Sequence, residues 1–158
     1  MVNSVDAQAE ELRSLMQRLF RRFGALASDS TPCGKPLTMA HAHALMVLLA
    51  KGELSQQELG RELCIDKSNV ARVCASLVAS GHLKQHTNEE DRRSRRVYLT
   101  AKGRRLAQEV SAASGARFGV LLDAVPIKAR KQVLGALRHL VTALDSLSAP
   151  PVAERSKE

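Results

Sequence analysis

Apolar residues recur at alternating steps of three and four residues near both ends of the chain, which is the period of an amphipathic helix. The N-terminal pattern predicts a helix over residues 6–28, with apolar positions at Leu12, Met16, Leu19, Phe23 and Leu26. The C-terminal pattern begins at Pro126, which suits the start of a helix, and continues through Val133, Leu137, Leu140, Leu144 and Leu147. Both stripes are too wide for one small domain to bury, so we expect a two-fold dimer to cover them.

A short helix in the middle of the chain has unusually clear start signals. Ser55 and Glu58 have the spacing of a capping box, and Leu54 and Leu59 stand in the positions of a hydrophobic staple. The helix is expected to end near Cys64.

The next helix is predicted to begin at Asp66, a good N-cap residue, and to end at Gly81, which suits a left-handed C-terminal position. Because a turn of about four residues joins these two short helices, the pair predicts a helix-turn-helix. An additional helix, capped by Thr38 and running to about Ala50, precedes them.

After Gly81 the pattern changes to that of strands. Residues 83–87 and 96–100 are each rich in strand-forming positions, and the highly charged residues 88–95 lie between them. This arrangement predicts a hairpin with a long polar tip, the wing of a winged helix. Thr100 then caps another helix that runs to about Leu122.

The predicted fold class is mainly α with a small β-wing, and the chain is expected to form a single domain over 1–158. Residues 38–102 form the winged helix-turn-helix lobe. Dimerisation helices flank it within 6–37 and 103–148, and the polar residues 149–158 are expected to be disordered.

The outer face of the fourth predicted helix carries hydrogen-bonding and cationic side chains, if its valines and leucine face inward. These residues are Lys67, Ser68, Asn69, Arg72 and Ser76. In the major groove of a DNA duplex, Arg72 can bind guanine and Asn69 can bind adenine. Lys67 and Ser68, near the helix N-terminus, suit phosphate contacts. This face therefore favours a DNA-reading helix over an ordinary solvated one.

The wing carries a second cationic cluster, formed by Arg92, Arg93, Arg95 and Arg96. Arginines crowded at a hairpin tip repel one another unless an anion is near, and a narrow minor groove attracts arginine strongly. Asp91 would repel phosphate, so we expect it to orient Arg93 through a paired hydrogen bond. Gln56, at the start of the third helix, completes the predicted DNA contacts.

Charge and composition agree with a duplex partner. The net charge is +8, and the segment from Lys51 to Arg105, with twelve basic and seven acidic residues, contributes +5 of it. Aromatic residues are scarce, which argues against a platform for single strands. With no apolar run long enough for a membrane span and no signal peptide, we expect a cytoplasmic protein without membrane contact.

Several of these segments together resemble the MarR (multiple antibiotic resistance regulator) family of bacterial repressors. The matching segments are Leu54–Leu59, Ser68–Arg72, the wing signature Asp91, Arg93, Leu99 and Thr100, and the following Ala101–Gly103. The resemblance implies a homodimer with interlocking flanking helices, a palindromic operator, and release from DNA by a small molecule or an oxidant. It also implies that Arg93 enters the minor groove, oriented by Asp91.

A small aromatic or phenolic effector is the partner that such a regulator would sense. Arg21, Arg22, His41 and His43 are the candidate polar anchors for its carboxylate. The alternative is a redox-sensing regulator of the same fold that uses Cys33, which lies close to Lys35 in the loop after the first helix.

Other chemistries find less support in the sequence. Cys64 and Cys74 continue apolar faces and are predicted to be core residues. His41 and His43 point in nearly opposite directions on a helix, so no metal site is expected, and no cofactor is implied. Enzyme motifs such as G-x-S-x-G and H-E-x-x-H are absent, so we expect no catalytic activity. A winged-helix module for protein interaction or RNA binding is the remaining alternative.

Overall fold

The computed structural model describes residues 4–27, 29–87 and 95–148. Its elements in chain order are α1 (Ser4–Phe23), α2 (Met39–Lys51), β1 (Leu54–Ser55), α3 (Gln56–Leu63), α4 (Lys67–Ala79), β2 (Leu83–Thr87), β3 (Arg95–Leu99), α5 (Ala101–Asp123) and α6 (Ile127–Ser148). This mainly helical chain with a small sheet has the predicted fold class. It divides within α5 into two compact units, one up to Arg117 and one from Phe118.

Four predicted helix caps are confirmed. The side chains of Thr38, Ser55 and Asp66 each accept a hydrogen bond from the backbone N–H three residues later, at the starts of α2, α3 and α4. Glu58 completes the capping box by accepting from the backbone N–H of Ser55 at 2.7 Å. The Thr100 hydroxyl accepts from the backbone N–H of Gly103 at 2.9 Å and caps α5 in the same way. Local chemistry thus fixes where these helices begin.

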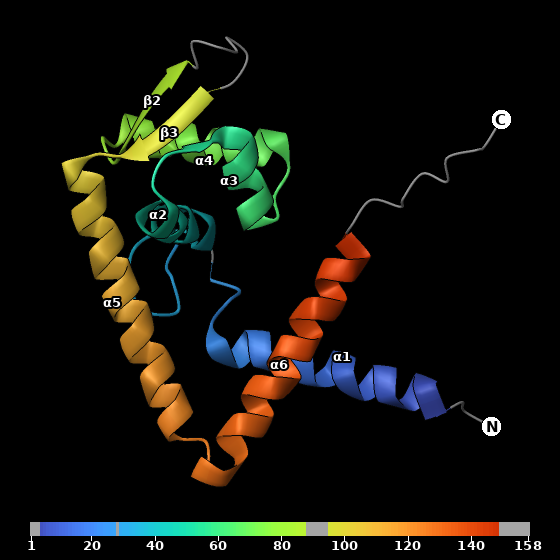
Figure 1. Ribbon diagram of the computed structural model, residues 1–158. Coiled ribbons are helices and arrows are strands. Elements are labelled where there is room, and N and C mark those ends of the chain that lie inside the picture. Colours follow the sequence, from blue (N-terminus) through green and yellow to red (C-terminus); the bar gives the residue numbers. More distant parts are fainter. Residues whose placement is uncertain (1–3, 28, 88–94, 149–158) are drawn as a thin grey trace, which may run out of the picture. The chain divides into compact units, whose positions relative to one another are not determined.

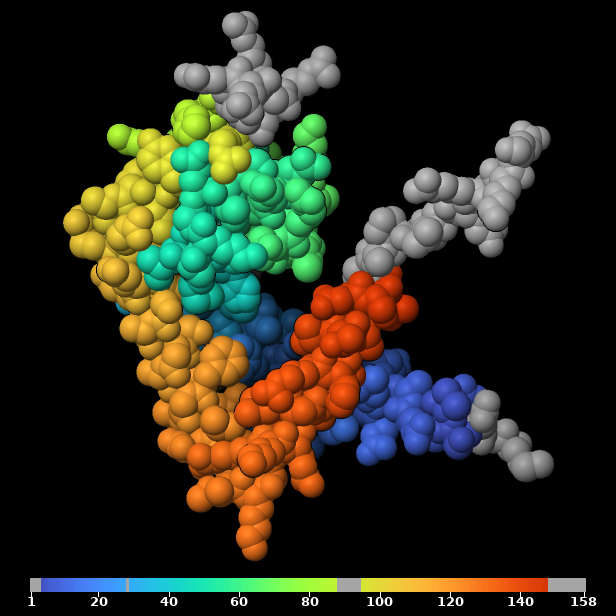
Figure 2. Space-filling view, in the orientation of Figure 1, coloured from blue at the N-terminus to red at the C-terminus, as the bar shows by residue number. Residues whose placement is uncertain are grey.

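Figure 1 shows the elements of the helix-turn-helix lobe, defined here as residues 38–100. Its apolar core also includes Ala107 of α5. In Figure 2 the side chains of this region form a close-packed mass. The predicted inward face of α4 is confirmed, since Val70, Val73, Cys74 and Leu77 are all buried. Other buried members are contributed by α2, α3 and the sheet: Ala44, Leu45, Leu48, Leu59, Leu83 and Val97. The outer face of α4 is positioned by this core.

The sheet has three antiparallel strands in the order β1-β3-β2. The hairpin of β2 and β3 pairs Leu83 with Leu99 and Thr87 with Arg95. The strand β1 was not predicted; it consists of two residues, and Leu54 pairs with Val97. β3 ends at Leu99 rather than at residue 100, because the next residue, Thr100, turns its side chain to cap α5.

Two other sequence expectations were wrong. Helix α1 ends at Phe23 rather than at residue 28, because Gly24 takes a left-handed φ of 87° and ends the helix. Cys64 is exposed, not a core residue: it is the C-cap of α3 with a left-handed φ of 53°, and this conformation turns its side chain away from the apolar face. The half-buried Ile65 packs against the core instead.

The second unit comprises the end of α5, a short connection and α6. Arg130 fixes the connection by donating to the backbone oxygen of Val125 at 3.1 Å and to a carboxylate oxygen of Asp123 at 3.2 Å. The predicted apolar stripe of α6 is largely exposed, for instance at Leu137 and Leu144. Among the described helices, none is long and apolar enough to cross a membrane.

Candidate nucleic-acid interface

The exposed face of α4 presents most of the predicted base-reading residues together. Lys67, Ser68, Arg72 and Ser76 are exposed, and Asn69 is half-buried, while the opposite face of the helix packs into the core. The predicted cluster therefore lies on one face of one helix.

A chain of hydrogen bonds joins three side chains along the first two turns of α4. A carboxylate oxygen of Asp66 accepts from the backbone N–H of Asn69 at 2.8 Å, and its other oxygen accepts from the Asn69 amide nitrogen at 2.5 Å. The Asn69 amide oxygen accepts in turn from the Arg72 guanidinium at 2.5 Å. These bonds fix the direction of Arg72 before any ligand is present.

The electrostatics of this chain favour an ionised carboxylate. The backbone N–H of Asn69 holds the pKa of Asp66 below its ordinary value, and the Asn69 amide, the Ser68 N–H and the Arg72 charge act in the same direction. Asp66 is thus negatively charged at neutral pH and accepts hydrogen bonds only.

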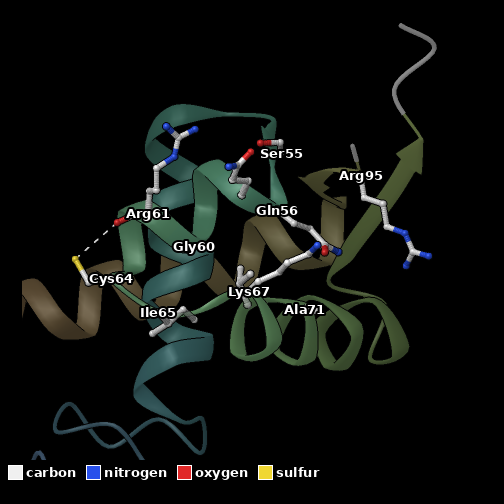
Figure 3. A pocket seen from close by; sticks show the side chains of 11 residues that line it. Ser55, Gln56, Gly60, Arg61, Cys64, Ile65, Lys67, Ala71 and Arg95 are labelled. Atoms are coloured by element: carbon white, nitrogen blue, oxygen red, sulfur yellow. Dashed lines mark hydrogen bonds between the residues drawn. The ribbon is translucent and has the colours of Figure 1, made fainter. Parts of the chain in front are cut away.

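A pocket of about 760 Å³ lies beside this face (Figure 3). Figure 3 shows Arg61 of α3 and Cys64, the residue that caps this helix, at one side and Arg95 of β3 at the other. Gln56 and Lys67, both predicted DNA contacts, also line it, and the Gln56 amide donates to the Gln85 amide oxygen at 3.4 Å. The starts of α3 and α4 and the strand β3 of the wing therefore line the same pocket. Arg61 is a cationic residue of this surface that sequence reasoning missed.

The base of the wing is held by an ion-pair cluster. The Nε of Arg96 donates to an oxygen of Glu53 at 2.7 Å, and Nε2 of His86 lies 3.0 Å from the same oxygen. A second Arg96 nitrogen lies 3.9 Å from a Glu58 oxygen. The Arg96 hydrogen bond is the main reason that the pKa of Glu53 is lowered. Burial opposes this effect, and His86 adds a smaller lowering contribution.

Because of this cluster, the two described wing arginines differ in their availability to DNA. Arg95 is exposed, as a DNA contact requires, whereas Arg96 is directed toward two carboxylates that would have to release it. Sequence reasoning missed Glu53 and His86, which lie 43 and 10 residues from Arg96. The predicted contacts Asp91, Arg92 and Arg93 lie outside the described residues, so the proposed pairing of Asp91 with Arg93 stays a prediction.

The C-terminal end of α4 is fastened to the start of α5. The Thr100 hydroxyl donates to the Gly81 oxygen at 2.7 Å, and Lys102 donates to the Ser80 oxygen at 2.7 Å. Gly103 comes so close that a Cβ there would lie 1.9 Å from the backbone oxygen of His82. Only glycine fits at this position. Helix α4 is therefore held at its end by these contacts and at its start by the Asp66 cap.

The candidate effector residues occupy different environments. Arg21 and Arg22 are exposed in the last turn of α1, and His43 is exposed on α2. His41 is half-buried: its Nδ1 lies 2.5 Å from the Thr38 hydroxyl, and its Nε2 is buried without a hydrogen-bond partner among the described atoms. Burial lowers the pKa of His41, which favours the neutral ring. The structure does not bring these four residues into one described pocket.

The three cysteines also differ in environment. The Cys33 sulfur lies 2.9 Å from the Thr31 hydroxyl, whereas the Lys35 ammonium is directed to Glu109 at 3.3 Å. Burial raises the pKa of Cys74 to about 11, so this thiol stays protonated. Within the described ranges, no group of three or more histidine, cysteine or acidic side chains could hold a metal ion.

Comparison with known proteins finds a family likeness for part of the chain. Residues 35–94, which include α2, α3, α4 and β2, match the sequence profile described as MarR family. The matched part, less than half of the chain, is thus similar to the MarR family. The MarR match covers the helix-turn-helix and continues into the wing, the part of the chain that carries the interface described above.

A curated relative also resembles part of this chain. The HTH-type transcriptional regulator TtmR of Methylorubrum extorquens is 34% identical over 70 residues, which is 44% of this chain and 36% of that protein. The match thus spans little more than a third of the relative's length.

The two solved structures resemble a larger share of the chain. Bordetella bronchiseptica BpsR, a protein whose DNA binding is regulated by 6-hydroxynicotinic acid, is 23% identical with a TM-score of 0.70, covering 83% of this chain and 98% of its own. Streptococcus pneumoniae FabT, solved in complex with DNA, is 19% identical with a TM-score of 0.69, covering 92% and 100%. At these identities the likeness shows the fold.

Proposed function

We propose that this chain is a MarR-family transcriptional repressor that binds a palindromic DNA duplex as a homodimer and is released by a small aromatic or phenolic molecule. The observation that carries the proposal is the outer face of α4, where exposed cationic and hydrogen-bonding side chains stand on a helix fixed by a buried core. A helix of this kind fits the major groove, where base edges display distinct donors and acceptors.

Each part of the interface has a separate task in this proposal. The first turns of α4 enter the major groove, with Arg72 at the base edges and Lys67 and Ser68 at phosphates. Gln56 and Ser76 contact the duplex at the two ends of this surface. The wing arginines, among which Arg95 is exposed in the structure, lie along the adjacent minor groove. FabT, which has a similar fold, was solved in complex with DNA, and this supports DNA as the partner.

The homodimer follows from the flanking helices, which we treat as parts of one MarR-like domain. Helix α1 buries no residue, and large apolar side chains of α6 such as Leu137 and Leu144 are exposed. Exposed stripes of this length are a liability for a monomer and typical of an interface. Two-fold pairing would also place two α4 helices about 34 Å apart, one turn of duplex DNA.

Release by a small molecule is supported by the likeness to BpsR, whose DNA binding is regulated by 6-hydroxynicotinic acid. In this chain Arg21, Arg22, His41 and His43 are the proposed anchors for an aromatic acid. The buried Nε2 of His41, which has no partner among the described atoms, can form a hydrogen bond to such a ligand.

The central test is fluorescence anisotropy of the purified protein with duplex fragments of its own genome, in reducing buffer without added small molecules. We expect selective binding whose affinity falls steeply with salt, because lysine and arginine displace counterions from phosphates. Arg72→Ala should weaken binding to the selected duplex by about tenfold or more, since one bidentate contact contributes about 1–3 kcal/mol.

The matched control is Lys128→Ala, which removes an equally exposed positive charge in the first turn of α6. It should leave the affinity within about twofold. Equal losses from both substitutions would mean that only net charge matters, and a protein that ignores every duplex would overturn the proposed function.

A further inference from the structure

The polar face of α4 contains a relay that is fixed within the protein itself. Its three members, Asp66, Asn69 and Arg72, follow one another at steps of three residues, and each is joined to the next by a hydrogen bond of 2.5 Å. Asn69 is half-buried in the middle, whereas Arg72 at the end of the relay is exposed. The relay therefore ends in an arginine that is accessible to a ligand, and its partner Asn69 is less so.

Electrostatics leave the Asn69 amide only one favourable orientation. Its N–H group faces the Asp66 carboxylate, which accepts hydrogen bonds, and its oxygen faces the Arg72 guanidinium, which donates them. A flipped amide would place its oxygen against the carboxylate and its N–H against the guanidinium, and both contacts would be repulsive. The neighbours on each side thus determine the direction of the amide.

Bidentate recognition of adenine needs both ends of an asparagine amide. In this structure both ends of Asn69 already have a protein partner, Asp66 and Arg72, which leaves the amide one N–H and one lone pair in the plane that these partners set. Arg72 is engaged at only one of its guanidinium nitrogens by Asn69, and the fork of an arginine has five N–H donors. The free donors of Arg72 suffice for the O6 and N7 atoms of guanine.

We propose that Asn69 is a positioning residue, which holds Arg72 in the conformation that reads a guanine, and that Asp66 orients Asn69 for this task. The proposal rests on the DNA-binding function proposed above and assigns Asn69 a role different from the adenine contact expected from its residue type. An arginine side chain carries about 2 kcal/mol of rotamer entropy. Holding it in place before binding lowers the cost of ordering it on the DNA.

The first experiment selects sequences from a randomised duplex library with the full-length protein and its variants. Arg72→Ala should abolish the preference for guanine at one position of each half-site. Asn69→Ala should reduce the preference at that same position by about three- to tenfold. Combining the two substitutions should add nothing to the loss caused by Arg72→Ala alone. The proposal is overturned if Asn69→Ala instead removes an adenine preference at another position and leaves the guanine intact.

A companion variant separates the relay from the helix cap. Asp66→Ser keeps a good N-cap side chain, so α4 should still form, but it removes the second carboxylate oxygen that binds the Asn69 amide. It should weaken the guanine preference in the same direction as Asn69→Ala. If Asp66→Ser leaves the preference at the wild-type level, Asp66 has no part in orienting Asn69.

The second experiment needs no DNA and so separates this proposal from the proposed function. Side-chain nitrogen relaxation in the free protein should show an Arg72 guanidinium that is ordered in the wild type and more mobile in Asn69→Ala. Equal mobility in both proteins overturns the positioning role, whatever the protein binds. An ordered Arg72 in a protein that ignores every duplex would instead overturn the proposed DNA-binding function and, with it, the guanine-reading part of this proposal.

Discussion

The helix-turn-helix lobe buries leucine side chains in its core, whereas the flanking helices α1 and α6 leave similar side chains exposed. In the lobe, Leu45 and Leu59 are 0% exposed, while in α6 Leu137 is 45% exposed and Leu144 is 59% exposed. The lobe therefore completes its core within one chain, and the flanking helices leave theirs open. A region that closes its own core holds a binding face rigidly, whereas a region with an open stripe depends on another surface for stability.

The largest effect is expected where the lobe joins α5. Gly103→Val should lower the free energy of unfolding by about 3 kcal/mol or more and abolish DNA binding, because its Cβ would collide with the His82 backbone. Chemical denaturation followed by circular dichroism measures the change. Gly115→Ala in the same helix is the matched control. Outside its chain neighbours and the helix's own backbone, the added Cβ would meet no described atom within 4 Å, so this variant should be as stable as the wild type or up to about 1 kcal/mol more stable.

Charged substitutions in the exposed apolar stripe of α6 test whether the flanking helices depend on a second chain. The double substitution Leu137→Asp and Leu144→Asp should convert the proposed dimer to a monomer, as measured by analytical ultracentrifugation, because desolvating two carboxylates in an apolar interface is unfavourable. Operator affinity should fall by about a hundredfold once two half-sites must be bound independently.

The lobe of this variant should remain folded, since its core does not include α6. A dimer of unchanged stability would mean that α6 is not the interface. Unfolding of the lobe would contradict its independence.

A smaller effect is expected at the base of the wing. Glu53→Gln removes the carboxylate that holds Arg96 and His86, and exposed ion pairs of this kind contribute at most about 1 kcal/mol. We expect a stability change within that range and a steeper salt dependence of DNA binding, because Arg96 becomes available to a phosphate. Lys35→Ala, which removes a surface ion pair to Glu109 in the same unit, should leave the salt dependence unchanged.

The smallest effect concerns pH. Because burial lowers the pKa of His41, the unfolded state binds more protons than the folded state below the ordinary histidine pKa of about 6.5. Stability should therefore fall as pH decreases through this range, and His41→Leu should reduce the fall. Denaturation at pH 7.5 and 5.5 measures it, with the exposed His43→Leu as the control. An acid sensitivity that is the same in His41→Leu and wild type would contradict the assignment.

The sequence predicted the elements whose causes are local. Thr38, Ser55, Asp66 and Thr100 cap helices through side chains that bond within three residues, so their roles could be inferred from spacing alone. The periodic apolar face of α4 could also be predicted from the sequence. The relay of Asp66, Asn69 and Arg72 also had a signal, the repeated step of three, but side-chain directions were needed to choose it over separate contacts with bases.

The features that were missed depend on contacts between distant residues or on single backbone conformations. Strand β1 exists because Leu54 pairs with Val97, and no local pattern marks a strand of two residues. Glu53 and Arg96 are 43 residues apart, so only the fold shows that they meet. Cys64 lies outside the core because it takes a left-handed backbone conformation itself. Its apolar neighbours in the sequence did not indicate this conformation.

The junction between α4 and α5 has a mechanical consequence. Two side-chain hydrogen bonds and the close approach at Gly103 join Ser80, Gly81 and His82, which directly follow α4, to the start of α5, so a rotation of one helix is resisted by the other. In the proposed dimer, a twist of α5 about its own axis would carry Arg72 along an arc. Such a displacement would change the spacing of the two α4 helices, which must match the helical repeat of DNA.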